Sequence, residues 1–121
     1  GCSSGFGPCP QGDLWVLDLK TNRWSELAPP GAKPSPRSNP SLSYNSAKGE
    51  LVLFGGQAGR DKSAETWSYN IARNAWTRSD MSGPGPRSSH ATAPDPTGKR
   101  MVIFGGQAPA GPNAEVWVWG Y

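Results

Sequence analysis

The hydrophobic pattern of the chain contains one segment that occurs twice. The apolar residues Leu51–Phe54 run directly into Gly55 and Gly56, and the same arrangement returns as Met101–Phe104 followed by two glycines. A short apolar run bounded by turn residues predicts a buried strand. The glycine pair after it predicts a backbone conformation or a close approach that a side chain would prevent.

The rest of the chain alternates short strand-like runs with turn residues. Branched and aromatic residues fill the runs, while Asn, Gly, Pro and Ser fill the intervals, which predicts antiparallel hairpins. Residues 28–36 and 57–64 read as loops. The predicted strands are 13–19, 23–27, 40–44, one starting at Leu51, 65–71 and 75–78, after which the same order begins again beyond Arg87.

The repeat extends over most of the chain. Residues 34–70 align with 84–120 without a gap, and the first hairpin matches the middle unit through its two tryptophans and an asparagine. Loops that change length around a constant set of strands are typical of β-repeat proteins. The matching pairs include Pro34/Pro84, Pro36/Pro86, Arg37/Arg87, Phe54/Phe104, Gln57/Gln107, Glu65/Glu115, Trp67/Trp117, Trp15/Trp67, Asn22/Asn74 and Trp24/Trp76.

Composition and charge exclude several classes of function. Glycine (16) and proline (13) are abundant among the 121 residues, yet the repeated aromatic residues favour turns between strands over disorder. The net charge of +3 is spread singly along the chain and forms no basic stripe, so no nucleic-acid partner is predicted. No apolar run approaches the roughly 20 residues of a membrane helix, and no signal-peptide pattern is present. Because the chain does not start with Met, we expect Gly1 to be a processed or fragment end.

The two cysteines, Cys2 and Cys9, lie in an N-terminal segment, residues 1–12, that precedes the repeats. A disulfide between them would close a small flexible loop and stabilise the fold by about 2.5 kcal/mol. The alternative is two free thiols in a cytosolic protein. The disulfide would favour an extracellular or secretory location over the cytoplasm, without deciding the compartment. With one histidine in the chain, no zinc site is predicted.

A unit of about 50 residues with these elements resembles the kelch repeat. The motifs that carry the resemblance are Pro-x-Pro-Arg at 34–37 and 84–87, Phe-Gly-Gly at 54–56 and 104–106, Glu-x-Trp at 65–67 and 115–117, and Asn-x-Trp at 22–24 and 74–76.

The resemblance implies an all-β fold of kelch-type β-propeller blades, each with four strands A to D. Residues 13–121 then hold about two and a quarter repeats. They would be the C and D strands of one blade (13–33), a complete blade (34–83) and the A, B and C strands of a third (84–121). Two blades would leave large apolar faces bare. We therefore expect an incomplete propeller that belongs to a longer kelch protein or to a multichain assembly.

The repeated residues are interpreted as structural. We assign Gly55, Gly56, Gly105 and Gly106 to blade geometry, because no phosphate-binding Lys-Ser/Thr follows them. Trp67, Trp76 and Trp117 are predicted core residues, with sugar stacking as the alternative. The resemblance implies that Arg37 and Arg87 brace adjacent blades, with Asp13, Glu65 and Glu115 as candidate partners; ligand binding is their alternative role. His90 aligns with Pro40, so it belongs to no repeated site.

Kelch propellers that bind peptides use positions just after the Gly-Gly pair and two residues after the Pro-Arg pair. In this sequence those positions are Asn39, Gln57, Ser89 and Gln107, and the adjoining loops add Arg60 and Lys62. The four matching positions are uncharged, whereas binders of strongly acidic peptides present arginines there. The resemblance therefore implies a protein partner that is not an acidic peptide.

The leading hypothesis is a non-catalytic protein-binding or scaffold module with no cofactor and no metal. One alternative is a segment of an extracellular enzyme similar to galactose oxidase, which needs copper ligands. The chain has one histidine, and its tyrosines Tyr44, Tyr69 and Tyr121 show no metal-ligand pattern. No Ser-His-Asp set or catalytic carboxylate pair is evident. The other alternative is a glycan-binding or structural fibre protein.

Overall fold

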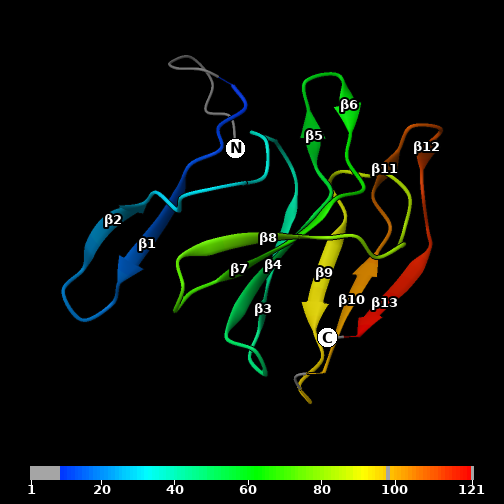
Figure 1. Ribbon diagram of the computed structural model, residues 1–121. Helices are drawn as coiled ribbons and strands as arrows, with labels where there is room; N and C mark the ends of the chain where they lie inside the picture. The colour runs from blue at the N-terminus through cyan, green and yellow to red at the C-terminus, as the bar shows by residue number, and fades with distance from the viewer. Residues whose placement is uncertain (1–8, 98, 121) are drawn as a thin grey trace.

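The computed structural model describes residues 9–97 and 99–120, and this part of the chain is built entirely of strands and turns. Its longer strands form three antiparallel sheets (Figure 1). The predicted all-β fold is confirmed. Cys2 lies outside the described residues, and so does the predicted Cys2–Cys9 pairing.

The three sheets follow one another along the chain. The first has the order β1-β2, the second β3-β4-β7-β8 and the third β9-β10-β13, and neighbouring strands are antiparallel throughout. These orders match the strand sets C-D, A-B-C-D and A-B-C expected from the sequence, while the residues at which one repeat gives way to the next stay a prediction. The strands are β1 (Leu14–Asp18), β2 (Arg23–Leu27), β3 (Ser41–Asn45), β4 (Glu50–Phe54), β7 (Thr66–Asn70), β8 (Ala75–Ser79), β9 (Ala91–Pro94), β10 (Arg100–Phe104) and β13 (Val116–Gly120).

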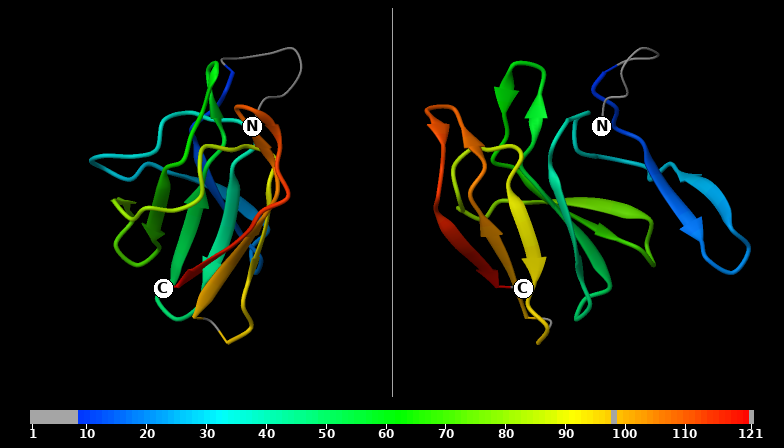
Figure 2. Two further views of the ribbon diagram at one scale, coloured as in Figure 1. Left: turned by 90° about the vertical axis from the view of Figure 1, so that its right-hand side faces the viewer. Right: turned by 180° about the vertical axis from the view of Figure 1, so that it is seen from behind.

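Two small ribbons differ from the sequence prediction, which gave loops in these places. β5 (Gln57–Ala58) pairs with β6 (Asp61–Lys62), and β11 (Gln107–Ala108) pairs with β12 (Gly111–Pro112). Two residues per strand are too few to show an alternating pattern, so these ribbons have no signal in the sequence. Both ribbons project from the same end of the molecule (Figures 1 and 2).

The core lies between the second and third sheets. Register places Val52 and Phe54 on one face of β4, opposite Ser68 and Thr66 of β7. That face meets the face of the third sheet on which Met101 pairs with Trp119. Burial of each such apolar side chain contributes roughly 1.5–3 kcal/mol. The fully buried members of this core are Val52, Phe54, Met101 and Ile103, with Trp119 packed against them.

Equivalent residues are buried to different extents in different repeats. Phe54 is 1% exposed and its counterpart Phe104 is 52% exposed, while Trp67 is 6% exposed and Trp117 is 39% exposed. Trp15 and Trp24 on the first sheet are also exposed. Trp67 is thus enclosed, and Trp76 is partly buried against Tyr69. Trp15 and Trp24 lie on a face without a neighbouring sheet among the described residues. Trp117 pairs with Ile103 on the face toward the second sheet, where it lines a cavity.

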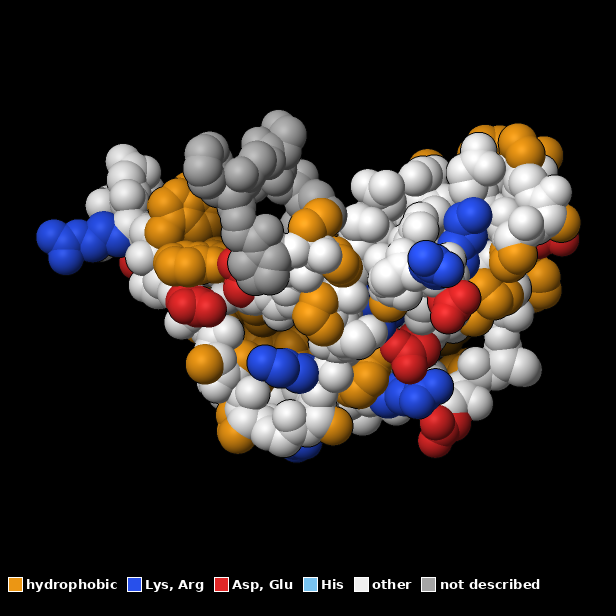
Figure 3. Space-filling model, turned by 90° about the horizontal axis from the view of Figure 1, so that it is seen from above, with side chains coloured by type: hydrophobic (Ala, Val, Ile, Leu, Met, Phe, Trp, Pro, Cys, Tyr) orange, Lys and Arg blue, Asp and Glu red, His pale blue; other side chains and the backbone are white. Residues whose placement is uncertain are grey.

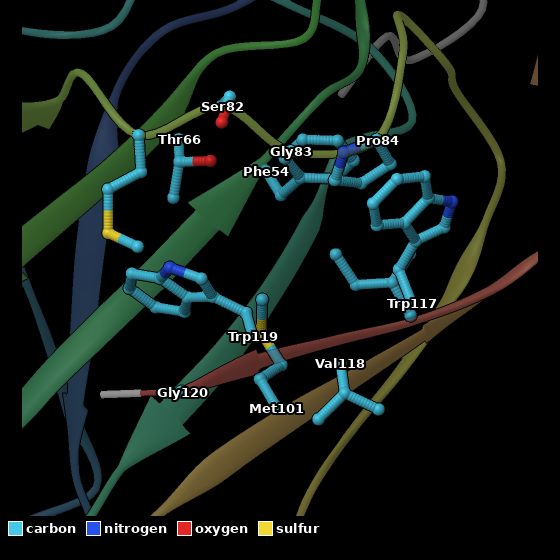
Figure 4. A pocket seen from close by; sticks show the side chains of 12 residues that line it. Phe54, Thr66, Ser82, Gly83, Pro84, Met101, Trp117, Val118, Trp119 and Gly120 are labelled. Atoms are coloured by element: carbon cyan, nitrogen blue, oxygen red, sulfur yellow. The ribbon is translucent and has the colours of Figure 1, made fainter.

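A cavity of about 180 Å³ separates the outer parts of the second and third sheets. Its walls come from β4, β13 and the segment that connects β8 to β9 (Figure 4). In the second sheet, Tyr69 packs against Trp76 of β8 at 5.2 Å between ring centroids. Trp119 holds the position of Tyr69 in the third sheet and instead lines this cavity. It is a space between blades and is lined mainly by apolar groups.

The glycine pairs occupy positions where a side chain would collide with nearby atoms, and at Gly55 these atoms belong to the next repeat. Gly55 has φ +65°, and a Cβ there would lie 2.6 Å from the carbonyl oxygen of Arg87 and 2.9 Å from Cε1 of His90. Gly59 has the same φ of +65° but has no atom within 4 Å of its Cβ position. The two residues share a backbone conformation and differ in crowding.

We therefore expect Gly55→Ala to destabilise the protein far more than Gly59→Ala. The left-handed backbone costs each variant about 1–2 kcal/mol, and the collision adds about 1–3 kcal/mol at Gly55 alone. Denaturant unfolding followed by tryptophan fluorescence measures the difference. Equal losses for the two variants would show that the next repeat does not press on Gly55.

Candidate binding surface

In each of the two aligned repeats, a buried arginine binds the first glycine of the Gly-Gly pair. Arg37 is 4% exposed and Arg87 is 1% exposed. Nη1 of Arg37 donates to the carbonyl oxygen of Gly55 at 3.0 Å, and Nη2 donates to Oε2 of Glu65 at 2.7 Å. Arg87 repeats both bonds at the same lengths, with the Gly105 carbonyl and Oε2 of Glu115. A planar guanidinium presents its donors on separate nitrogens in a fixed fork, whereas an ammonium has all three on one nitrogen.

The expected bracing of adjacent blades takes a different form. Each guanidinium bonds to a carboxylate and a glycine carbonyl of its own repeat. Between the repeats, the main chain of Arg87 makes two hydrogen bonds: its N–H donates to the Ser63 carbonyl and its own carbonyl accepts from Gly56. Asp13 accepts a bond from the indole Nε1 of Trp15 at 2.7 Å rather than from either arginine.

These hydrogen bonds also lower the pKa of the acidic partners. The Arg37 side chain, with a smaller contribution from Trp67, holds the pKa of Glu65 below its ordinary 4.5 against the opposing effect of burial. Bonds from Trp117 and then Arg87 lower the pKa of Glu115. Both carboxylates are therefore charged at neutral pH and attract the buried guanidinium groups.

The predicted partner-binding residues gather at one end of the sheets. Single bridges pair Ser38 with Gln57 and Ser88 with Gln107, so the positions after each Gly-Gly pair lie beside those after each Pro-Arg pair. Asn39 and Ser89 both have left-handed backbones, with φ of 50° and 55°. The N–H of Ser89 donates to the carbonyl of Asn39, which brings the two repeats side by side.

The two ribbons extend this surface. Nζ of Lys62 donates to the carbonyl of Ala108 at 3.3 Å, joining the tip of one ribbon to the other, and Arg60 is exposed at the first tip. The structure thus brings Asn39, Gln57, Lys62, Ser89 and Gln107 to the same end of the molecule. Sequence reasoning missed the Lys62 bond because its acceptor is a main-chain carbonyl, which carries no residue signature.

The charge distribution at this end is mixed. Figure 3 shows basic and acidic side chains scattered among apolar and uncharged groups, without one large patch of a single sign. Within the described ranges no group of three or more His, Cys, Asp or Glu side chains could hold a metal ion. Nor does any helix in the described part of the chain have the length and apolar character needed to cross a membrane. The surface suits contacts through hydrogen bonds and apolar groups. The binding roles given to its residues stay predictions.

The contribution of the forked hydrogen bonds of Arg37 to stability can be tested on a single carboxylate. Glu65 is bound by the buried Arg37 and also by Arg78, which is 56% exposed and 3.4 Å away. We expect Arg37→Lys to cost about 2–3 kcal/mol, because several hydrogen bonds of about 1 kcal/mol are lost. Arg78→Lys, the matched control, should change stability by about 0.5 kcal/mol or less.

The acid dependence gives this prediction a second measurement. Since the folded pKa of Glu65 is depressed, its stabilisation is present above 4.5 and is lost as the pH falls through the depressed value. Urea unfolding across acidic pH should show that loss in the native protein and a smaller one in Arg37→Lys. Similar free energies of unfolding for Arg37→Lys and Arg78→Lys would rule out the hydrogen bonds of Arg37 as the source of this stabilisation.

Comparisons with known proteins agree with these features. The sequence matches the family described as the KLHDC2/KLHL20/DRC7 Kelch-repeats domain over residues 1–120. It is similar to Kelch domain-containing protein 2 of Bos taurus, with 39% identity over 67 residues. That match covers 54% of this chain and 16% of the relative, so the chain corresponds to a small part of that protein's length.

Proposed function

This chain belongs to the kelch-repeat family, and we propose that it acts as a non-catalytic protein-binding or scaffold module within a larger kelch propeller or assembly. Kelch domains commonly bind proteins. The observation that carries the proposal is the pairing of equivalent polar residues from two repeats at one end of the sheets. Loops held on a rigid strand frame are common sites of binding.

The rigidity of this surface supports recognition of a protein. The main chain of Gln57 exchanges two hydrogen bonds with that of Ser38, at 2.8 and 2.9 Å, and Gln107 does the same with Ser88. The side chains on this backbone can still adapt to a partner, although Nε2 of Gln57 donates to the Gly59 carbonyl at 3.2 Å. A surface whose backbone is already fixed loses little conformational entropy on binding.

The exposed sheet faces support the second part of the proposal. Phe104, Val116 and Val118 are each more than half exposed on one face of the third sheet. The equivalent face of the second sheet, which carries Val52 and Phe54, is covered by its neighbour. A contiguous apolar face of this kind is typical of an interface. We propose that a further blade covers it, in the same chain or in another.

Loop variants test the binding surface. The double change Gln57→Ala and Gln107→Ala, combined with Arg60→Glu, should weaken binding of a protein partner at least about tenfold, since one interface residue worth about 1.4 kcal/mol is enough for that loss. The matched control changes Lys48 and Arg73, exposed in turns at the other end, to Glu. Quantitative co-purification measures partners kept by the control and lost by the loop variant. Equal retention by both would exclude this surface.

A variant on the bare face tests the assembly. Val118→Asp places a charge on a side chain that is 55% exposed, so the described sheets should keep their contacts. We expect it to abolish association with further blades, because burying an unpaired charge costs several kcal/mol. Ser46→Asp, at an exposed turn, is the control. Size-exclusion chromatography with light scattering reports the change, and a native chain that is a stable folded monomer would refute the requirement for further blades.

A further inference from the structure

His90 is the one histidine of the chain and lies buried where the second and third sheets meet. It directly precedes β9 and is 9% exposed. Its Nε2 lies 2.7 Å from Oγ of Ser41, the first residue of β3. The imidazole therefore makes a side-chain hydrogen bond from one sheet to the other.

The ring is closely surrounded, and among the described residues it has no second polar partner. Its edge packs against Phe54 with 5.1 Å between centroids, and Cε1 lies 2.9 Å from the position that a Cβ on Gly55 would take. Nδ1 is buried and makes no hydrogen bond. This seam between the sheets is also where Phe54 joins the core with Met101 and Ile103.

Protonation would change the balance of donors in this site. Neutral imidazole has one N–H, and the Ser41 hydroxyl can serve Nε2 as donor or acceptor. When Nε2–H donates to Ser41, Nδ1 of the neutral ring carries no proton; the imidazolium has two N–H groups, so Nδ1 then becomes a buried donor without an acceptor. An unsatisfied buried donor is strongly unfavourable. The charged ring therefore fits this position poorly.

The electrostatics act in the same direction. Burial, and secondly the positive charge of Arg87, lower the pKa of His90 below 6.5. The Arg87 guanidinium faces Glu115 and the Gly105 carbonyl, so it is held in place. From the other elements packed on the ring, β3 contributes the hydroxyl of Ser41 and β4 contributes Phe54, both uncharged. Among the described residues, no carboxylate contributes to the pKa shift of His90, so no negative charge there offsets the charge of an imidazolium.

We propose that His90 makes the seam between the second and third sheets sensitive to acid, so that its protonation loosens their contact. The folded state disfavours the proton that the unfolded or opened state accepts. By linkage, the seam is strongest above 6.5, the ordinary pKa of histidine, and weakens as the pH falls through that value toward the depressed one. The residue that aligns with His90 in the preceding repeat is Pro40, so that repeat does not carry the acid-sensitive histidine.

The test uses the protein purified together with any blades that accompany it. Hydrogen exchange is followed at about pH 7 and pH 5, a range in which histidine is the side chain with an ordinary pKa that titrates. The amides of Gly56, Arg87 and Ser89 donate across the seam. After correction for intrinsic exchange, their opening should rise by up to about tenfold for each unit of pKa depression. Amides inside the β4–β7 ladder should change less.

A variant and a direct titration separate His90 from other acid effects. His90→Gln keeps a group able to bond Ser41 but cannot titrate, so its seam amides should show no change between those pH values. Acid loss of the Glu65 and Glu115 contacts begins only below 4.5. The NMR signal of the imidazole Cε1–H should titrate below 6.5. Because the chain has one histidine, the assignment of this signal is unambiguous when only this chain is isotope-labelled.

Three results would overturn the inference. They are seam amides in the native protein that are indifferent to pH, a His90 signal that titrates at its ordinary value, and a His90→Gln variant with the acid response of the native protein. The first two measurements need no variant, so failure of His90→Gln to fold leaves the inference testable. None depends on a binding partner, which keeps this test separate from that of the proposed function.

Discussion

The structure depends on Arg87, a residue that is buried, charged and hydrogen-bonded on both of its sides. Its guanidinium fastens the glycine carbonyl that ends β10 to the carboxylate that precedes β13. Its main chain accepts from Gly56 and donates to Ser63 of the preceding repeat. A buried guanidinium is stable only when its donors are satisfied and its charge is paired. The same residue therefore contributes both to the fold of the third sheet and to its attachment to the second.

The glycine pairs complete this arrangement by allowing the main chains to approach. A Cβ on Gly106 would lie 2.8 Å from both the Ser88 carbonyl and Cβ of His90. The sequence predicts a structural role for these glycines, because a repeated Gly-Gly without phosphate-binding neighbours has few other uses. It also predicted the strand orders. It did not predict how Arg37 and Arg87 divide their bonds, since residue type shows that a guanidinium needs acceptors but not which carbonyl lies within reach.

Burial was the property that the repeat could not predict. Phe54 and Phe104 occupy the same position of two aligned repeats, and one is enclosed while the other is half exposed. The difference lies in the neighbouring sheet, which exists for Phe54 and is not among the described residues for Phe104. In a stacked repeat each unit gains its stability from adjacent units as well as from its own contacts. The predicted incomplete enclosure of this chain follows from that dependence.

The same reasoning explains where features peculiar to one repeat should be sought. Positions that repeat are constrained by the geometry common to all blades, so they carry little information about what one blade does. His90 is an outlier in the alignment, and the sequence identifies it as such, but its burial and its bond to Ser41 depend on a contact between residues 49 positions apart. Gly55 and Gly106 shape the space that holds its ring. A repeated steric frame thus encloses a residue that does not repeat, and that residue gives one seam a chemistry that the repeat alone does not provide.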